Sequence, residues 1–558
     1  MEKKPKGGFK AVPFIIGNNG LMSMVMTALS ANLIMYLMRE YHMEMANGTN
    51  LIYIWTALSN AAPILAAFMA DSLVGRFQMI GLGSVFALLG TSLIWLPTVI
   101  MQAKPPHCSE SNDKCTPATT PQLVLLCAAL FTFAAGYGGV MSSSLAFGSD
   151  QLKHFENASK TERYFTWFYA TSSFSSLVGF TGLVYLQENF GWKFGYGALL
   201  ALTLIAVVGF FSGSAWYVKP TPTKNLITGL FEVMVASYRN RHIKVYLGSD
   251  ETEYYSKGST LSHPSDKLRC LNKACIIQDP QRDLTADGRA VNPWKLCTVD
   301  QVEELKALIK VIPIWTTRVL MSINISQGSF SVLQATSLDR HIGPKFEIPA
   351  GSVASFVAAF IVTWIVLYDR VILPLASAIR GKTVHFSTKS RMGCGIFVSF
   401  LAMAAVATVE GIRRRVAIKE GYEDDPKGVI HMSILWVVPQ YALMGLAEGL
   451  NTIAQNEFYI SEFPKSMSSI ASSLFGLSMA IASLVSSCLM SIVNNLTSRG
   501  GRESWISSNI NKGHYDYFHW VLAGLSMVNF LLFLAFSKVY GPFKDQRIEA
   551  QVDEEDEM

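Results

Sequence analysis

The chain has 558 residues, of which half are apolar and only 16% are charged, with a formal net charge of +5. Soluble domains carry about 25% charged residues, so this composition excludes an ordinary soluble enzyme or a string of soluble domains. Metal-ligand spacings, a nucleophile elbow and a phosphate-binding glycine loop are missing from the sequence, and we therefore expect no enzyme activity and no metal site.

Apolar runs of about 20 residues, the length that crosses a bilayer as a helix, recur along the whole chain. In chain order they cover residues 14–38, 51–70, 77–101, 121–146, 165–187, 194–216, 306–333, 351–371, 391–412, 430–452, 467–493 and 516–540. In hydrocarbon every backbone amide must be satisfied within its own segment, which excludes open sheets. The sequence therefore predicts an all-α polytopic membrane protein with twelve transmembrane helices in a lipid bilayer.

The predicted spans divide six and six around a long polar segment. We expect a cytoplasmic N-terminus at 1–13, an N-terminal six-helix bundle at 14–216 and a cytoplasmic linker at 217–305. A C-terminal six-helix bundle at 306–540 and an acidic cytoplasmic tail at 541–558 complete the chain. The first apolar run is too long for a signal peptide and lacks a small-residue cleavage site, so we interpret it as the first span.

Two features of the predicted outer loops agree with a cytoplasmic N-terminus. Asn47 and Asn495 begin glycosylation sequons that fall outside the cell in this topology. Cys108 and Cys115 share a short outer loop, where they could form a disulfide; two free thiols are the alternative. The excess of basic residues on the cytoplasmic side gives weak additional support, because most of it lies in the long linker.

Two turns on the expected cytoplasmic side resemble each other. The turn after the second span contains Asp71, Gly75 and Arg76, and the turn after the eighth contains Asp369 and Arg370. Parallel six-helix repeats are a signature of the major facilitator architecture, in which the substrate site lies between the halves. We interpret these five residues as a candidate cytoplasmic gate; plain ion pairs at helix ends are the alternative.

Seven short motifs, in order along the chain, resemble one plant transporter family. They read AFMADSLVGRF at 67–77, SLAFGSDQL at 144–152, NPWKLC at 292–297, IPAGS at 348–352, GLAEG at 445–449, EFPKSM at 462–467 and NKGHY at 511–515. The chain thus resembles the plant nitrate/peptide transporter family, the plant branch of the proton-coupled oligopeptide transporters. The segments KLRCLNKAC at 267–275 and MSINISQ at 321–327 are most similar to its first subfamily, described as low-affinity nitrate transporters.

The resemblance implies that a proton-coupling motif is absent from the first span. Family members typically carry Glu-x-x-Glu-Arg at the positions that correspond to Asn19, Met22 and Ser23, which share one helix face. A basic residue on the fourth span in many members corresponds to Met141. A histidine on the seventh span, implicated in nitrate binding, corresponds to Asn324.

Glu448 and Arg318 are the ionisable residues that this comparison leaves in the cavity. An unpaired carboxylate at the bilayer centre costs about 2.5–3.5 kcal/mol on insertion scales, so we expect Glu448 to face the cavity with a partner or to be protonated. Arg318 either supplies a positive charge to the cavity or extends to the cytoplasmic interface. Arg318 and Asn324 are about 240° apart around a helix, so both need not face the cavity.

These inferences predict a low-affinity nitrate transporter that works by alternating access with weakened or absent proton coupling. The alternatives are a carrier of a plant hormone, glycoside or other small organic solute, and a non-transporting receptor on the same fold. We expect a small-molecule or anion substrate, no nucleic-acid partner, and no cofactor beyond protons as a coupling ion. The family default for the location is the plasma membrane. The sequence does not indicate the oligomeric state. The candidate cavity residues are Asn19, Ser23, Asn32, Tyr36, Met141, Asn324, Gln327, Arg318 and Glu448.

Overall fold

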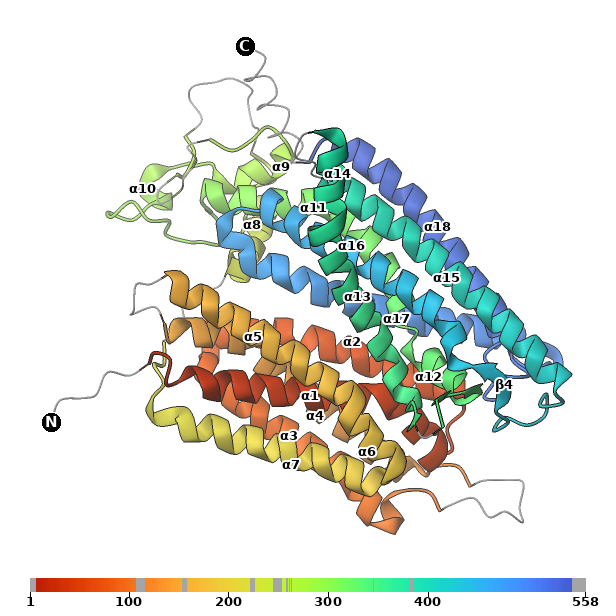
Figure 1. Ribbon diagram of the computed structural model, residues 1–558. Helices are drawn as coiled ribbons and strands as arrows, with labels where there is room; N and C mark the ends of the chain where they lie inside the picture. Colours follow the sequence, from red (N-terminus) through yellow and green to blue (C-terminus); the bar gives the residue numbers. More distant parts are fainter. Residues whose placement is uncertain are drawn as a thin grey trace.

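The computed structural model describes residues 7–106, 116–152, 158–220, 226–243 and 253–543, apart from 257, 258, 260, 262, 345 and 382–385. Within these ranges the protein is almost entirely helical, and its long helices form two bundles (Figure 1). The predicted fold class, an all-α polytopic protein built as two bundles, is confirmed.

The N-terminal bundle consists of helices that run back and forth through the molecule. They are α1 (Val12–Glu40), α2 (Met45–Met69) with the π turn η1 (Ala70–Val74), α3 (Arg76–Val99), the turn η2 (Met101–Ala103), α4 (Thr120–Asp150), α5 (Ala158–Val178) continuing through η4 (Gly179–Leu183) into α6 (Val184–Asn189), and α7 (Trp192–Ser212) with η5 (Gly213–Ala215). Helices α3 and α4 approach so closely that a Cβ on Gly136 would lie 2.2 Å from the backbone nitrogen of Ala87. Glycine is therefore required at this crossing.

The linker and the C-terminal bundle, which follow along the chain, are also mainly helical. The linker contains α8 (Leu226–Arg239), α9 (Arg269–Asn272), η6 (Lys273–Cys275) and α10 (Pro280–Asp283). The bundle consists of α11 (Val299–Ile325), α12 (Gly328–Thr336), η7 (Ala350–Ala354), α13 (Ser355–Leu367), η8 (Tyr368–Ile372), α14 (Leu373–Arg380), α15 (Thr388–Lys419), η9 (Ile434–Val437), α16 (Val438–Glu462), η10 (Lys465–Met467), α17 (Ser468–Thr497), η11 (Arg499–Gly501) and α18 (Tyr515–Tyr540). Two short pairings, β1 (Leu338–Asp339) parallel to β4 (Ile430–Ser433) and β2 (His341–Ile342) antiparallel to β3 (Phe346–Glu347), lie at its far end.

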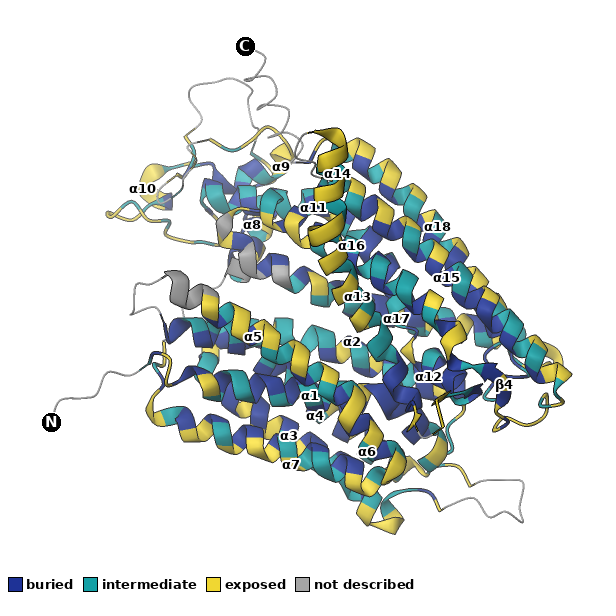
Figure 2. Ribbon diagram, in the orientation of Figure 1, coloured by how far each residue is buried: buried dark blue, intermediate teal, exposed yellow. Residues whose placement is uncertain are grey.

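Ten helices in the described part of the chain are long and apolar enough to cross a membrane. The two remaining predicted spans, 165–187 and 430–452, coincide with helical stretches, α5–η4–α6 and α16, whose sequences are more polar. Large apolar side chains cover the outward faces of the bundles, including Leu65, Phe194 and Val362, each more than 60% exposed (Figure 2). Such faces suit contact with lipid rather than water.

Two predicted boundaries are wrong. The tenth span does not begin at 430, because Ile430–Ser433 pairs with β1 and the helix starts only at Val438, with Pro439 in its first turn. Proline is tolerated there because a first-turn amide has no helical acceptor. The linker ends before 305, because α11 begins at Val299 behind a capping box formed by Thr298 and Gln301.

The two bundles contact each other at the end of the molecule opposite the linker, which we call the outer side (Figure 1). Arg340 pairs with Glu188 of α6 at 3.3 Å, and the same carboxylate accepts a hydrogen bond from the amide of Gly351. Nearby, Ser352 Oγ donates to the carbonyl of Phe180 at 2.6 Å. These bonds close the outer side.

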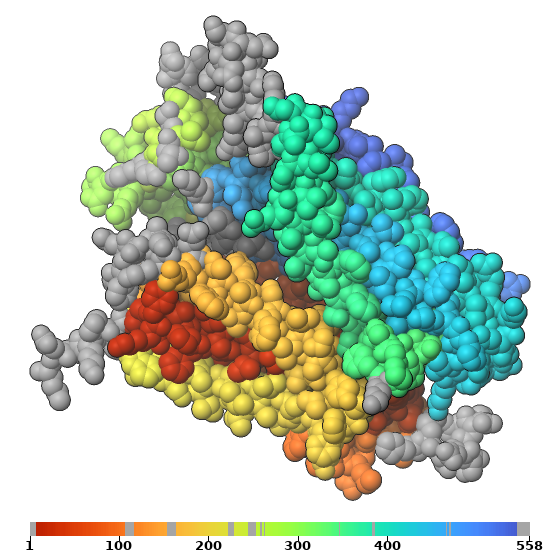
Figure 3. Space-filling view, viewed as in Figure 1, coloured from red at the N-terminus to blue at the C-terminus, as the bar shows by residue number. Residues whose placement is uncertain are grey.

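Further along the same interface, α2 is joined to the C-terminal bundle. Tyr53 donates from its hydroxyl to Gln327 at 2.9 Å, and Asn50 exchanges hydrogen bonds with Ser487 and Ser491 of α17. Figure 3 shows the N-terminal bundle, coloured red to yellow, meeting the C-terminal bundle, coloured green to blue, at this outer side. The described residues therefore join the two bundles at the outer side.

Candidate functional site

An ion pair between α11 and α16 is the centre of the candidate site. Arg318 Nη2 lies 2.6 Å from Glu448 Oε1, and Nη1 donates to the second carboxylate oxygen at 2.9 Å. The arginine side chain is 1% exposed and the glutamate side chain 14% exposed. A bidentate guanidinium–carboxylate pair fixes both side chains in one geometry and cancels their charges. The prediction that Glu448 has a partner is met, and the partner is Arg318 rather than a residue of the other bundle.

Three neighbours hold this pair in place. Thr452, one turn along α16, donates to Glu448 Oε1 at 2.6 Å, and Asn451 accepts from Arg318 Nη1 at 3.3 Å. The guanidinium carbon of Arg318 lies 4.9 Å from the ring centroid of Phe475 on α17. Among the described residues no acceptor bonds to the buried Nε–H of Arg318, so one donor remains available next to the pair. The expectation that Arg318 extends to the cytoplasmic interface does not hold.

The three coupling-motif positions on α1 lie inside the N-terminal bundle. Asn19 is 1% exposed and donates to Ser172 Oγ of α5 at 2.8 Å. Met22 is fully buried in the bundle core, and Ser23 is 5% exposed. The structure therefore places none of them on an open cavity wall, because α1 is enclosed by its neighbouring helices. None of the three carries an ionisable side chain.

Two other predicted cavity residues, Tyr36 and Asn324, also belong to bundle interiors. Tyr36 packs in an aromatic cluster with Tyr41 and Tyr196 at the outer end of the N-terminal bundle. Asn324 donates to hydroxyls of α15 and α18, so it faces the interior of the C-terminal bundle, away from Arg318. Met141 is half-buried on α4, and the assignment of Tyr36, Asn324 and Met141 to a substrate cavity stays a prediction.

Asn32 and Gln327 lie at the outer contact between the bundles. Gln327 accepts the hydrogen bond from Tyr53, and the Asn32 side chain approaches so closely that a Cβ on Gly351 would lie 2.4 Å from its Oδ1. Asn32 and Arg340 also line a small cavity of about 100 Å³. Both predicted residues therefore belong to the outer closure rather than to the central site.

The first predicted gate forms an ion-pair network within the N-terminal bundle. Arg76 donates from Nε to Asp71 at 2.9 Å and from Nη1 to Asp150, at the end of α4, at 2.7 Å. Gly75 precedes α3 with φ of 90°, a conformation that favours glycine.

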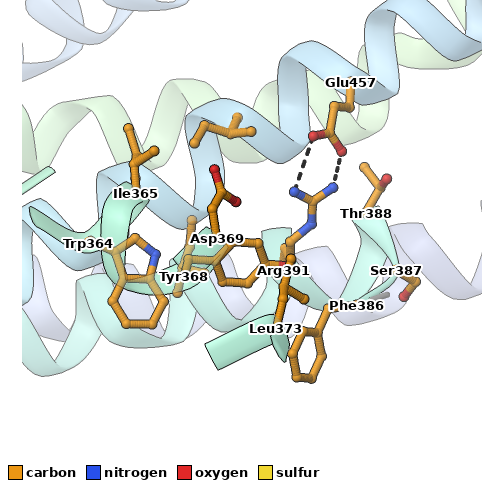
Figure 4. Close-up of a pocket in the computed structure, with 13 residues that line it drawn as sticks. Trp364, Ile365, Tyr368, Asp369, Leu373, Phe386, Ser387, Thr388, Arg391 and Glu457 are labelled. Carbon is orange, nitrogen blue, oxygen red and sulfur yellow. Dashed lines mark hydrogen bonds and ion pairs between the residues drawn. The ribbon is translucent and has the colours of Figure 1, made fainter. Parts of the chain in front are cut away.

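The second predicted gate has a different set of contacts from the first. Asp369 and Arg370 are both exposed, and no ion pair between them is described. Arg391, at the start of α15, instead pairs with Glu457 at the end of α16 through both carboxylate oxygens (Figure 4). By position in the repeat, Arg391 corresponds to Arg76, because each lies in the first turn of the third long helix of its half. A gate role for Asp369 and Arg370 stays a prediction.

The predicted outer-loop sites have a different local structure from the one expected. Asn47 lies in the first turns of α2 and Asn495 in the last turn of α17, so both sequons are helical, and both asparagines are exposed. Cys108 and Cys115 lie outside the described residues. Sequence reasoning also missed Thr452, Asn451 and Tyr53. The four-residue spacing from Glu448 to Thr452 was a usable signal.

Two helical bundles joined at the outer side, with a buried charged pair inside the second bundle, have the arrangement of a membrane transporter of the major facilitator type. A family model described as "PTR2: POT family" matches residues 77–506. The chain belongs to this family of membrane transporters.

Named relatives lie in its plant branch. The chain is 49% identical to "Protein NRT1/ PTR FAMILY 1.2" and 47% identical to "Protein NRT1/ PTR FAMILY 1.1", both of Arabidopsis thaliana. These matches cover 98% of this chain and 91% and 93% of the relatives. The predicted family resemblance is confirmed.

Solved structures agree with the fold. The POT family transporter PepTSo superposes with a TM-score of 0.69 at 17% identity, covering 95% of this chain and 98% of that one. A POT family transporter in complex with 5-aminolevulinic acid gives a TM-score of 0.62 at 14% identity over 96% of this chain and 99% of that one. At these identities the likeness concerns the fold alone.

Proposed function

We propose that the protein carries a small monovalent anion, nitrate first among the candidates, by alternating access with weakened proton coupling. The observation that supports this proposal is the Arg318–Glu448 pair, which joins two helices of the same bundle. An anion that enters between the bundles competes with Glu448 for the guanidinium. Arg318 therefore binds the substrate anion in place of the Glu448 carboxylate.

The small number of ionisable residues near this pair limits the proton coupling of transport. The positions on α1 contribute no ionisable group, and Met141 on α4 offers no cation to which Glu448 could transfer when the bundles rock. Glu448 is then the single carboxylate at this centre that can take a proton. Because moving one net negative charge into a negative-inside cell costs about 2.3 kcal/mol per 100 mV, one proton per anion makes transport electroneutral at best. Inward transport driven by the membrane potential is excluded under this proposal.

A flux experiment on the purified full chain tests the proposal. Reconstituted into liposomes, it should exchange labelled nitrate with little dependence on an imposed membrane potential, and Arg318→Gln should abolish the flux. The matched control is Glu462→Gln, which removes the carboxylate of a second α11–α16 ion pair, to Lys310 at 3.1 Å, nearer the helix ends. This control should leave nitrate flux largely intact.

Three outcomes would contradict parts of the proposal. A proton-evoked inward nitrate current, abolished by Glu448→Gln, would show strong coupling through this site. Flux of a hormone or glycoside without nitrate flux would reassign the substrate. Binding without flux of any tracer would favour a receptor. Fluorescent tagging in plant cells tests the plasma membrane as the location.

A further inference from the structure

A second cavity lies within the C-terminal bundle, on the inner side and apart from the Arg318–Glu448 pair. It encloses about 480 Å³ between η8, α15 and α16 (Figure 4). The aromatic side chains of Trp364, Tyr368 and Phe386 line it together with the Arg391–Glu457 pair and Asp369, which lies next to Tyr368 (Figure 4). Such a pocket suits an amphiphile, because it offers both apolar rings and charged groups.

The two halves of the molecule differ at this place. In the N-terminal half Arg76 satisfies two carboxylates, and its Nε–H is taken by Asp71. In the C-terminal half Arg391 pairs with Glu457, but its Nε–H is buried without an acceptor among the described residues. Asp369, which corresponds to Asp71, lines the cavity and has no ion-pair partner in the described part of the chain. Among the described residues, an acceptor beside Arg391 Nε and a donor beside Asp369 are therefore absent.

The cavity lies at the depth of lipid head groups. Glu457 is 19 residues after the first residue of α16, about 28 Å along a helix, which is close to the thickness of the hydrocarbon core. Beside it, α13, η8 and α14 carry an exposed apolar stripe at four-residue intervals, Leu367, Val371, Leu375 and Ile379. This stripe runs on into α14, which stands clear of the bundle (Figure 1). Acyl chains can therefore reach the cavity from the membrane.

We infer that this cavity binds the phosphoethanolamine head group of a membrane lipid from the inner leaflet. A phosphate oxygen accepts from Arg391 Nε, and the primary ammonium donates to Asp369. Of the two carboxylates among the described lining residues, Glu457 pairs with Arg391, so the ammonium pairs with Asp369. A quaternary ammonium has no N–H to donate, and an anionic glycerol head group would meet Asp369 with like charge.

This binding site is independent of the transported substrate but adjoins the transport site. Gly449 and Leu450 line the cavity, and they directly follow Glu448 on α16. A Cβ on Gly449 would lie 3.0 Å from Trp364, so the helix is closely packed against this aromatic side chain. A lipid held here contacts the helix that carries the carboxylate of the Arg318–Glu448 pair.

Native mass spectrometry of the full chain tests the inference without any transport assay. Phosphatidylethanolamine, phosphatidylcholine and phosphatidylglycerol with identical acyl chains are added singly after delipidation. We expect severalfold greater retention of phosphatidylethanolamine than of the other two lipids. Asp369→Asn should bring the three to near equality, and Asp369→Lys, which places an ammonium in the cavity, should do the same. Both substitutions concern an exposed residue, and monodisperse gel filtration verifies their folding.

Asp266→Asn is the matched control, because it removes the same charge from an exposed position in the linker. It should leave the preference for phosphatidylethanolamine unchanged. Equal retention of the three lipids by the parent, or a preference that persists in Asp369→Asn, would overturn the inference. Soluble glycerophosphoethanolamine provides the last arm: binding as tight as that of the lipid would overturn the lipid as the source of the head group.

Discussion

Arg318 is expected to affect both the stability of the fold and the proposed transport, because it pairs with Glu448 inside the bundle. Removing one partner of a buried pair leaves the other charge without compensation and costs about 3–5 kcal/mol, whereas removing both is often nearly neutral. We expect Arg318→Met to lower the unfolding temperature strongly and Arg318→Met/Glu448→Gln to recover most of it. Thermal unfolding of the detergent-solubilised chain measures both. An unfolding temperature for the double variant no higher than that of the single variant would refute this account.

In the linker, the two nearby cysteines Cys270 and Cys275 should react very differently. Burial raises the pKa of the Cys275 thiol to about 12, whereas Cys270 is exposed. Because the thiolate is the reactive form, at neutral pH we expect a maleimide to label Cys270 first and Cys275 only after unfolding. Peptide mass spectrometry after timed labelling checks this, with Cys270→Ser as the control that removes the early signal. Labelling of both cysteines at one rate would show that the linker is open.

Residue-level prediction from the sequence succeeded where charge energetics constrained the answer. A carboxylate in mid-span demands a partner, and this predicted that Glu448 would be paired. Charge gives no such constraint for Tyr36 and Asn324, whose described contacts lie inside their own bundles, because polar residues in membrane helices also bond to neighbouring helices. Which face of a helix meets which neighbour is a tertiary property that spacing along one helix does not contain.

At the scale of the helices, the crossing of α3 and α4 depends on glycine. A Cβ at Gly136 would lie 2.6 Å from the carbonyl oxygen of Gly83, and backbone atoms cannot move aside as a side chain can. We expect Gly136→Ala to cost about 1–3 kcal/mol or more, because the helices must separate. Gly209→Ala on α7, where nothing lies within 4 Å of the added Cβ, is the matched control and should be neutral. Thermal unfolding compares the two, and equal losses would contradict the close crossing.

The sequence predicted the number and order of the membrane elements far better than their ends. Length and hydropathy sufficed for the spans because lipid permits few alternatives to a helix. The start of α16 was misplaced because Ile430–Ser433, which directly precedes an apolar run, forms a strand and not the first turn of the helix. High hydropathy identifies a helix whose side chains face lipid. It does not identify a helix that is enclosed by other helices, because such a helix can carry polar residues.

For the whole molecule, the outer contacts fix one conformation of an alternating-access cycle. Asn50 on α2 and Ser487 on α17 lie within hydrogen-bond distance, at 3.1 Å between Oδ1 and Oγ, and they belong to different bundles. A transporter must break this contact when it opens outward, because the bundles then separate at this end. The cysteine pair Asn50→Cys/Ser487→Cys, in a chain whose exposed cysteines are replaced by serine, should be joined by a short thiol-specific cross-linker.

Cross-linking this pair should stop nitrate flux, and a reductant that cleaves the cross-linker should restore it. The matched control is Thr497→Cys/Ser504→Cys, whose native hydroxyls lie 3.2 Å apart on the outer side within the C-terminal bundle. Because that pair moves as one body, its cross-linking should leave flux unchanged. Normal flux through a fully cross-linked Asn50/Ser487 pair would show that the bundles need not separate here. Substrate would then have to reach the Arg318–Glu448 pair by another route, and rocking of the two bundles would not be the mechanism.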